Sequence, residues 1–382
     1  MAISKHIRLV GPHGTNKVME GESIRLAKRA LTKYQHKKFV KKGTGTLLAE
    51  FDPQLALVLA NYHRTSSKVL MDLYCSNAKR LETLYQAFKT DASTDERGWC
   101  RDGQSISVAI KQTGDFPASS GQMIGTVKNA IIDGLAEKGI SLTVSTDDAE
   151  HVIVVRNHEG EISVSLDMVG FAKHLRGYRI EQGAAPLREN IAATLLMLAR
   201  WDSRKENLWD PMCGSGTIAI EAALAANAPP MWEARELACI HNPIFEESFT
   251  DAGALFTGTE PKIFASDKDP QQIRNTKSNA KRASVQSSIV VEKMDLFDQT
   301  APPQFGHGHG LILTNPPYNK RLETSEAFFE KLGAWSRKQK GYRFACLVDF
   351  PEFERHFGAR ARIKKPLYNG SLGSYFYLFD SP

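Results

Sequence analysis

The chain has 382 residues, of which 42% are hydrophobic and 24% are charged, a composition typical of folded globular proteins and unlike that of disordered ones. No apolar run approaches the roughly 18 residues needed to span a bilayer, and the N-terminus lacks the apolar core of a secretory signal, so a cytoplasmic protein without membrane contact is expected. The five cysteines are scattered and never form a C-x-x-C pair, which argues against a disulfide framework or a zinc site.

The positive charge is concentrated at the N-terminus. Residues 1–42 contain eleven Lys and Arg and only two acids, which gives this segment a net charge of +9. The whole chain has a net charge of +6, so the other 340 residues together carry −3. Apolar residues at helical spacing predict a helix over residues 22–38 that buries Ile24, Ala27, Leu31 and Tyr34. The opposite side of this helix carries Arg25, Lys28, Arg29 and Lys33. Such a face is either a solvated helix surface or a surface that binds a polyanion such as RNA.

The first 168 residues alternate between short strands and helices in an order typical of an α+β fold. Strands are expected first at residues 6–10, 45–51, 68–74 and 105–111, and then in three short runs before residue 167. Helices are expected over residues 22–38, 53–62, 77–88 and 122–137.

Residues 169–187 are irregular and rich in Gly and Arg, and a long apolar helix follows them, which predicts a domain boundary. Within this segment, Arg176 and Arg179 contact RNA phosphate or a cofactor, or they brace the junction; the sequence leaves these alternatives open. Downstream, strands and helices alternate as a mostly parallel α/β sheet requires.

The run "DPMCGSGTIAIEAALAA" predicts a cofactor loop. A strand ends at Asp210, a tight loop contains Gly214 and Gly216, and a helix begins near Thr217, so bare backbone and helix N–H groups face a ligand. The loop lacks the lysine of a phosphate-binding P-loop, and Ala219 replaces the third glycine of a dinucleotide motif. S-adenosyl-L-methionine fits better, because Asp210 can bind its ammonium and backbone N–H groups can bind its carboxylate.

Two further acids follow later strands. Asp267 ends the strand in "IFASDKDP" and can accept hydrogen bonds from both ribose hydroxyls of the cofactor. Asp295 follows "VVEKM" and can accept one from the adenine amino group. Three acids after three successive strands favour a cofactor site over isolated turn residues.

The stretch "LILTNPPY" indicates where the chemistry occurs. A predicted buried strand is followed directly by Asn315, Pro316, Pro317 and Tyr318. In parallel α/β sheets, ligands bind beyond the carboxyl ends of the strands. The Asn315 side-chain oxygen and the Pro316 carbonyl can accept the two N–H groups of an exocyclic amine and aim its lone pair at a sulfonium methyl. Tyr318 offers a ring on which a flipped base stacks.

The motifs "DPMCGSGT", "SDKDP", "DLFD" and "NPPY", in this order, resemble Rossmann-like methyltransferases that modify exocyclic amines. The junction "SLDMVGFAKHLRGYRIEQGAAPLRENIAATLL" resembles that of THUMP-domain RNA methyltransferases of the RlmL type, which methylate a guanine N2 in large-subunit ribosomal RNA. The resemblance covers nearly the whole chain and is weakest before residue 100. It departs from the family after NPPY, where Asn319 and Lys320 replace Gly-Glu.

The resemblance implies a ferredoxin-like piece (1–60), a THUMP-like RNA-binding module (61–168), a junction (169–187) and a methyltransferase domain (188–382). It implies S-adenosyl-L-methionine as cofactor, no metal, and unassembled or partly assembled large-subunit ribosomal RNA as partner. Other substrates remain open: a tRNA guanine, an adenine N6 or a protein glutamine. A non-catalytic RNA-binding protein of ribosome assembly is the remaining alternative.

Overall fold

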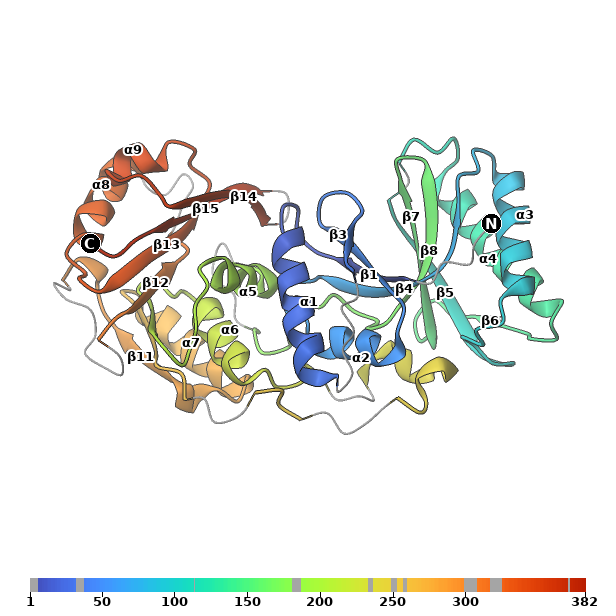
Figure 1. The fold of residues 1–382 in the computed structure, drawn as a ribbon, viewed down its shortest axis with the longest axis horizontal. Helices are drawn as coiled ribbons and strands as arrows, with labels where there is room; N and C mark the ends of the chain where they lie inside the picture. The colour runs from blue at the N-terminus through green and yellow to red at the C-terminus, as the bar shows by residue number, and fades with distance from the viewer. Residues whose placement is uncertain are drawn as a thin grey trace.

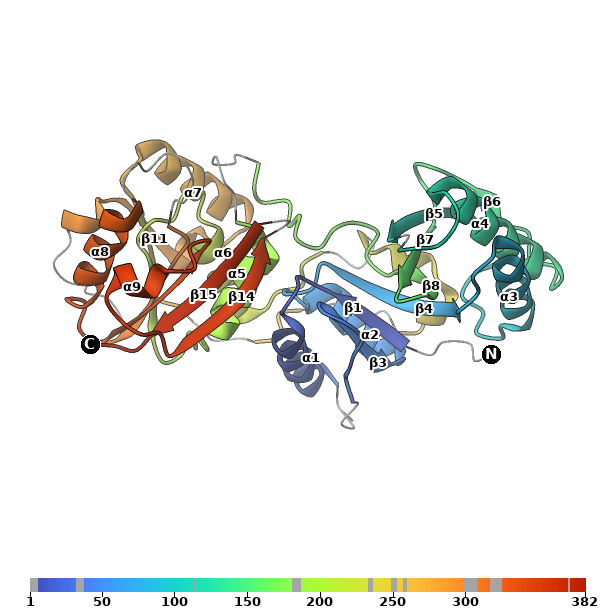
Figure 2. The ribbon, with the colours of Figure 1, turned by 90° about the horizontal axis from the view of Figure 1, so that it is seen from above.

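The computed structural model describes residues 6–31, 38–112, 114–180, 187–232, 236–248, 253–256, 260–298, 308–316, 325–369 and 372–382. These residues form an elongated molecule with two halves, each built on one β-sheet (Figure 1). Figure 2 shows the same two halves from above, with the first part of the chain in one and the last part in the other. No helix among the described residues is both long and apolar enough to cross a bilayer.

The N-terminal sheet has eight strands in the order β2-β3-β1-β4-β8-β7-β5-β6. Its central strand, β4, pairs antiparallel with β1 on one side and with β8 on the other. The predicted segments 1–60 and 61–168 therefore share one continuous sheet. The strands are β1 (His6–Val10), β2 (Val40–Lys41), β3 (Thr46–Glu50), β4 (Lys68–Ser76), β5 (Ser105–Gln112), β6 (Thr143–Val144), β7 (His151–His158) and β8 (Glu161–Asp167).

Four helices pack on this sheet around one hydrophobic core. They are α1 (Asn16–Ala30), α2 (Pro53–Tyr62), α3 (Leu81–Thr94) and α4 (Ser120–Ala136). The sequence encodes two of their starts directly: Asp52 accepts the Leu55 N–H at 2.9 Å ahead of Pro53, and Ser119 forms a reciprocal capping box with Gln122.

Helix α1 differs from the sequence prediction in its bounds and in its buried face. It begins at Asn16 and ends at Ala30, and residues 32–37 lie outside the described residues. Met19, Glu22, Ser23 and Leu26 are buried together with Ala27, whereas Ile24 is only half-buried. The inward face is set by a polar contact that hydrophobic periodicity cannot reveal, because Glu22 accepts N–H groups from the turn after α2.

The C-terminal sheet has seven strands in the order β11-β10-β9-β12-β13-β15-β14. Strands β11 to β13 are parallel, and β15 and β14 add an antiparallel edge. The predicted α/β class, with a mostly parallel sheet after an α+β region, is confirmed. The strands are β9 (Asn207–Asp210), β10 (Ile263–Asp267), β11 (Ile289–Lys293), β12 (Gly310–Thr314), β13 (Tyr342–Val348), β14 (Ile363–Asn369) and β15 (Leu372–Phe379).

Helices cover both faces of this sheet, and alternate strand residues point into two cores. Leu208 packs in the core beneath α5 (Glu189–Leu198), α6 (Thr217–Asn227) and α7 (Pro270–Arg282). Its neighbour Trp209 packs in the aromatic core beneath α8 (Ser325–Ser336) and α9 (Phe353–Phe357). This burial on both faces explains why these strands are continuous apolar runs in the sequence.

A segment inserted between α6 and β10, residues 228–256, reaches back to the N-terminal half, and Figure 1 shows it in yellow near α2. It contains the short helices η2 (Ala238–His241) and η3 (Pro243–Phe245), and Phe245 is buried in the N-terminal core. The Cys239 N–H donates to the Met168 carbonyl at 3.1 Å. The insertion therefore ties the two halves together. Two further short helices, η4 (Gln286–Ser288) and η5 (Leu296–Asp298), flank β11.

Candidate active site

The strand order places a crevice between β9 and β12. The chain moves outward from β9 to β10 and β11, then returns to the other side of β9 to form β12 and β13. Ligands of open α/β sheets bind at such a reversal point, beyond the carboxyl ends of the strands. Asp210 ends β9, and Asn315 directly follows β12. The two residues that the sequence singles out most strongly therefore flank the predicted binding crevice.

The glycine loop after β9 has the backbone that its sequence predicts. Gly214 and Gly216 have positive φ angles of 53° and 86°, and α6 begins at Thr217 as predicted. A Cβ on Gly216 would lie 2.7 Å from Thr276 Cγ2, so this position requires glycine. The Thr276 hydroxyl donates to the Gly214 carbonyl at 2.7 Å, and Asn279 donates to the Ser215 carbonyl at 3.0 Å. Helix α7 thus fixes the loop, a role that the sequence prediction missed.

The Asp210 carboxyl group is buried at the end of β9, with 1% of the residue exposed. Burial raises the pKa of Asp210 to about 7, and the nearby Asp267 carboxylate adds to the rise, while contacts with Thr314 and the Met212 N–H oppose it. No cation among the described residues pairs with Asp210. A buried carboxylate that lacks a positive partner is suited to bind an ammonium group.

Asp267 and Asp295 lie at the ends of the next two strands, β10 and β11. Asp267 accepts the Gly214 N–H and the Asp269 N–H, each at 2.9 Å and each on a different oxygen. A carboxylate has about four acceptor positions, so two remain for hydroxyl donors. Asp295 accepts the Phe297 N–H at 2.9 Å through one oxygen. These contacts fix both carboxylates and leave acceptor capacity on each, and their roles toward a cofactor stay predictions.

Asn315 carries the most informative atom of the site. Its side-chain Oδ1 is buried and accepts no hydrogen bond from any described residue. A buried acceptor without a donor costs free energy, about 1–3 kcal/mol, and such groups in folded proteins call for an explanation. The adjacent Pro316 is buried. The other two predicted catalytic residues, Pro317 and Tyr318, lie outside the described residues.

Comparison with known proteins assigns the family. Residues 176–375, more than half of the chain, match the family described as RMKL-like, methyltransferase domain. The chain belongs to this methyltransferase family. A curated relative, "Ribosomal RNA large subunit methyltransferase K/L" of Chromohalobacter salexigens, is 31% identical over 354 residues, which is 86% of this chain and 48% of the relative. The chain spans about half the length of the curated relatives it matches.

Solved structures of other methyltransferases share the whole fold. SMU.472, a putative methyltransferase complexed with SAH, has a TM-score of 0.83 and 22% identity, and the match covers 100% of this chain and 99% of that one. A possible methylase from Clostridium difficile 630 has a TM-score of 0.79 and 26% identity, covering 99% and 98%. Family and fold together confirm the predicted class, a methyltransferase that uses S-adenosyl-L-methionine.

The two junction arginines of this methyltransferase are buried. The Arg176 side chain is 3% exposed and pairs with Glu221 on α6 at 3.2 Å; it also donates to the Arg64 carbonyl at 2.7 Å. The Arg179 side chain is 7% exposed, pairs with Glu189 at 3.2 Å and donates to the Leu187 carbonyl at 2.6 Å. Of the alternatives that the sequence left open, these contacts favour bracing of the junction over binding of RNA phosphate.

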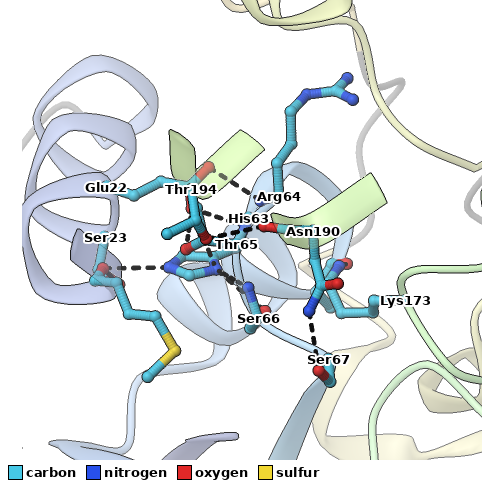
Figure 3. A network of polar contacts seen from close by, with 12 residues as sticks. Glu22, Ser23, His63, Arg64, Thr65, Ser66, Ser67, Lys173, Asn190 and Thr194 are labelled. Carbon is cyan, nitrogen blue, oxygen red and sulfur yellow. Dashed lines mark hydrogen bonds and ion pairs between the residues drawn. The ribbon is translucent and has the colours of Figure 1, made fainter. Parts of the chain in front are cut away.

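A buried polar network continues from these arginines to α1, and Figure 3 shows its centre. Glu22 accepts the Arg64 N–H at 2.8 Å and the Thr65 N–H at 2.9 Å, and the Thr65 hydroxyl also donates to it, at 2.6 Å. His63 lies 3.4 Å from the same carboxylate. Burial lowers the pKa of His63, while the Glu22 charge opposes the decrease. Buried hydrogen bonds thus fix helix α1 to the turn after α2, and Arg64 of that turn lies 3.7 Å from Glu221 in the methyltransferase half.

The predicted cationic face of α1 is exposed. Arg25, Lys28 and Arg29 all face solvent, whereas Lys33 lies outside the described residues. Arg25 and Arg29 lie over the Phe256 ring, with guanidinium carbons 5.4 Å and 5.9 Å from its centre. Two of the predicted RNA-binding residues therefore also contact the segment inserted before β10.

Proposed function

We propose that this protein transfers a methyl group from S-adenosyl-L-methionine to the exocyclic N2 amine of a guanine in large-subunit ribosomal RNA. Membership of the methyltransferase family supports the reaction class. The residues around Asn315 support an exocyclic amine as the acceptor. The ribosomal substrate is supported by the name of the curated relatives, "Ribosomal RNA large subunit methyltransferase K/L", and by the cationic N-terminal segment of this chain.

The observation that carries the proposal is the buried Oδ1 of Asn315, which has no donor among the described residues. An exocyclic amine has two N–H groups and a lone pair delocalised into the ring, so it is a poor nucleophile. Acceptance of one N–H by Asn315 and of the other by the Pro316 carbonyl draws the nitrogen toward tetrahedral geometry and frees its lone pair. These two acceptors also stabilise the positive charge that develops on the nitrogen.

The residues present fit the cofactor. S-adenosyl-L-methionine supplies an electrophilic methyl group on a sulfonium. The buried Asp210 would bind its ammonium, the loop at Gly214 would let its amino-acid end approach the main chain, and Asp267 and Asp295 would bind ribose and adenine. A Cβ placed on Gly214, whose φ is also positive, would have no atom of the described residues within 4 Å, so bare backbone is open to a ligand at this position.

A product analysis tests the proposal. Incubation of the protein with cofactor labelled in its methyl group and with protein-free ribosomal RNA, followed by digestion to nucleosides, should yield labelled N2-methylguanosine. Because guanine N2 is buried by base pairing in a helix, transfer to unassembled RNA should be faster than transfer to finished ribosomes.

Each alternative predicts a different labelled product in the same experiment. Label in N6-methyladenosine would overturn the guanine assignment and leave the amine chemistry of Asn315 intact. Label in tRNA alone would identify tRNA and not ribosomal RNA as the substrate. Label in protein alone would exclude RNA as the methyl acceptor. Binding of RNA without cofactor binding or any transfer would support a non-catalytic assembly protein.

A further inference from the structure

A cleft with a volume of about 1120 Å³ separates α1 from the methyltransferase sheet. One wall is the exposed side of α1, and the other is formed by the end of α5, residues 200–204 and the start of β14. In Figure 1, α1 stands beside α5 and the end of β14. Neither the family match nor the site described above gives this cleft a role.

The cleft lies at the amino edge of the sheet, opposite the crevice at Asn315. Residues 200–204 precede β9, whereas Asp210 ends it. Helix α6 begins beside the cofactor loop, and its penultimate residue, Ala226, lines the cleft. From Thr217 to Ala226 the helix rises by about 1.5 Å per residue, which separates the two sites by about 14 Å. The cleft and the cofactor crevice are therefore distinct.

Positive charge dominates the lining. Two acids face the cleft, and both are already engaged. Glu22 holds the N–H groups described above, and Asp202 pairs with Arg204 at 3.1 Å. The other lining cations are Lys17, Arg25, Arg29, Arg64, Arg200 and Lys365. The lining favours an anionic occupant, because the cations outnumber the acids and the acids have their own donors.

Like charges face each other across the cleft. Lys17 on α1 and Lys365 on β14 both line it, and neither forms an ion pair with a described residue. Burial lowers the pKa of Lys365, and the ammonium of Lys17 adds to the decrease. Arg200 lies nearby with a φ of 52°, a left-handed backbone that arginine rarely adopts. An anion between these side chains would relieve the repulsion between the two lysines.

A buried arginine also lines the cleft. Arg64 is 3% exposed, and its Nε and Nη1 atoms donate no hydrogen bond to any residue that the structure describes. Its Nη2 donates to the Pro229 carbonyl at 3.2 Å, and Nη1 is 3.7 Å from a Glu221 oxygen. Figure 3 shows the guanidinium directed away from the Glu22 network. The cleft thus has a buried cationic donor as well as exposed ones.

We infer that this cleft binds the phosphate backbone of the RNA substrate. Its volume exceeds the roughly 300–1,000 Å³ of typical small-molecule pockets, which favours a length of chain over a single free phosphate. Trp201 and Phe256, which also line it, offer apolar surface beside the cations, as sites for single-stranded nucleic acid do. The choice of RNA as the anion rests on the proposed function.

Charge reversal of the two facing lysines tests this inference in the full-length protein. Lys17→Glu combined with Lys365→Glu should weaken binding to protein-free ribosomal RNA about tenfold or more at moderate salt. It should also reduce the slope of log affinity against log salt by about 1.4, the value for two lost phosphate contacts on a single strand. The affinity for S-adenosyl-L-methionine and the transfer rate at saturating RNA should not change.

A matched control separates the cleft from overall charge. Lys281→Glu combined with Lys340→Glu changes the net charge equally at exposed positions outside the cleft. This control should lower the RNA affinity less than about threefold. Equal losses in the two double variants would overturn the inference. Displacement of bound RNA by polyglutamate but not by DNA of equal length would do so too, because it would identify an acidic protein as the occupant.

The length of the RNA gives an independent readout. A short oligonucleotide that contains the methylated guanine cannot reach both edges of the sheet, so the cleft variant should use it with an unchanged KM. With long RNA, the same variant should show a raised KM and an unchanged kcat. A raised KM for both lengths would show that the substitutions do not act through a contact with the distant part of a long RNA, and it would overturn the inference. Absence of N2-methylguanosine with normal cleft-dependent RNA binding would instead overturn only the proposed function.

Discussion

The two edges of the methyltransferase sheet differ in charge and in how the chain builds them. At the carboxyl edge, short loops after consecutive strands bring together Asp210, Asp267 and Asn315, which are acceptors. At the amino edge, Lys17 and Lys365 come from two different halves of the molecule and are donors. One edge is suited to a cofactor ammonium and a target amine, and the other to phosphate.

This difference suggests how chemistry and substrate binding are divided. The acceptors of the carboxyl edge belong to the methyltransferase half alone, whereas the cationic cleft lies between α1 and that half, which are linked through Glu22, Arg64 and Glu221. A change at the carboxyl edge should therefore affect transfer or cofactor binding. A change at the amino edge should affect the affinity for long RNA.

The largest effect is expected from Asn315→Ala. The substitution removes one of the two amine acceptors and leaves Asp210 and the glycine loop intact. Loss of one preorganised group at a reacting centre typically lowers kcat by about 10²–10³-fold, and loss of orientation adds to this. The transfer rate with ribosomal RNA should therefore become nearly undetectable, while calorimetry should show unchanged cofactor binding. Turnover close to that of the wild type would disprove the role of Asn315.

Arg176→Gln should destabilise the protein without weakening its contact with RNA. The change leaves the buried Glu221 with the Tyr178 hydroxyl at 3.3 Å and, as its one remaining cation among the described residues, Arg64 at 3.7 Å. Loss of one partner of a buried ion pair typically costs about 3–5 kcal/mol. We expect about 3 kcal/mol in denaturant unfolding. The salt dependence of RNA binding should be unchanged.

Arg101→Gln is the matched control for Arg176. It removes a pair with Glu246 in which both side chains are at least half exposed, so it should cost less than about 1 kcal/mol. A reduced salt slope in Arg176→Gln, with normal stability, would restore the original RNA-binding interpretation of this arginine.

Cofactor binding should depend on pH through Asp210. The pKa of this carboxyl is about 7 without a ligand, and a bound ammonium favours the ionised form, so binding below pH 7 must release a proton. The affinity for S-adenosyl-L-methionine should therefore fall about tenfold per pH unit well below pH 7, as Asp210 becomes protonated. Titration calorimetry measures this directly. Asp210→Asn should bind more weakly and lose this pH dependence; a pH profile unchanged by the substitution would exclude Asp210 as the ammonium ligand.

The contrast between the edges also explains which features the sequence could predict. Strand β12, helix α2 and the start of α6 at Thr217 follow from local patterns, namely an apolar run, an Asp-Pro start and a glycine turn. Because parallel strands align their carboxyl ends, residues that follow them converge without any knowledge of tertiary contacts. The acceptors of the carboxyl edge were therefore predictable.

The remaining features depend on contacts between distant segments. Arg176 looks like an RNA ligand until its partner Glu221, 45 residues away, is known. Strand β14 was missed because Pro366 interrupts its pattern; proline is tolerated there because β14 is an edge strand that pairs only with β15. The Lys17–Lys365 pair that defines the cleft joins residues from opposite ends of the chain. No local pattern encodes such a pair.

The smallest effect is expected from Lys28→Ala, which tests whether the helix face or the cleft sets RNA affinity. Lys28 is exposed on α1 like Lys17, but it does not line the cleft. Loss of a peripheral charge should lower RNA affinity less than about threefold and change the salt slope by less than the roughly 0.7 of a full phosphate contact. Lys17→Ala should lose one full phosphate contact and therefore change the salt slope by roughly 0.7. Filter binding over a series of salt concentrations distinguishes the two variants. Equal slopes would show that RNA lies along the whole cationic face of α1, and the amino edge would then be only one part of a broader binding surface.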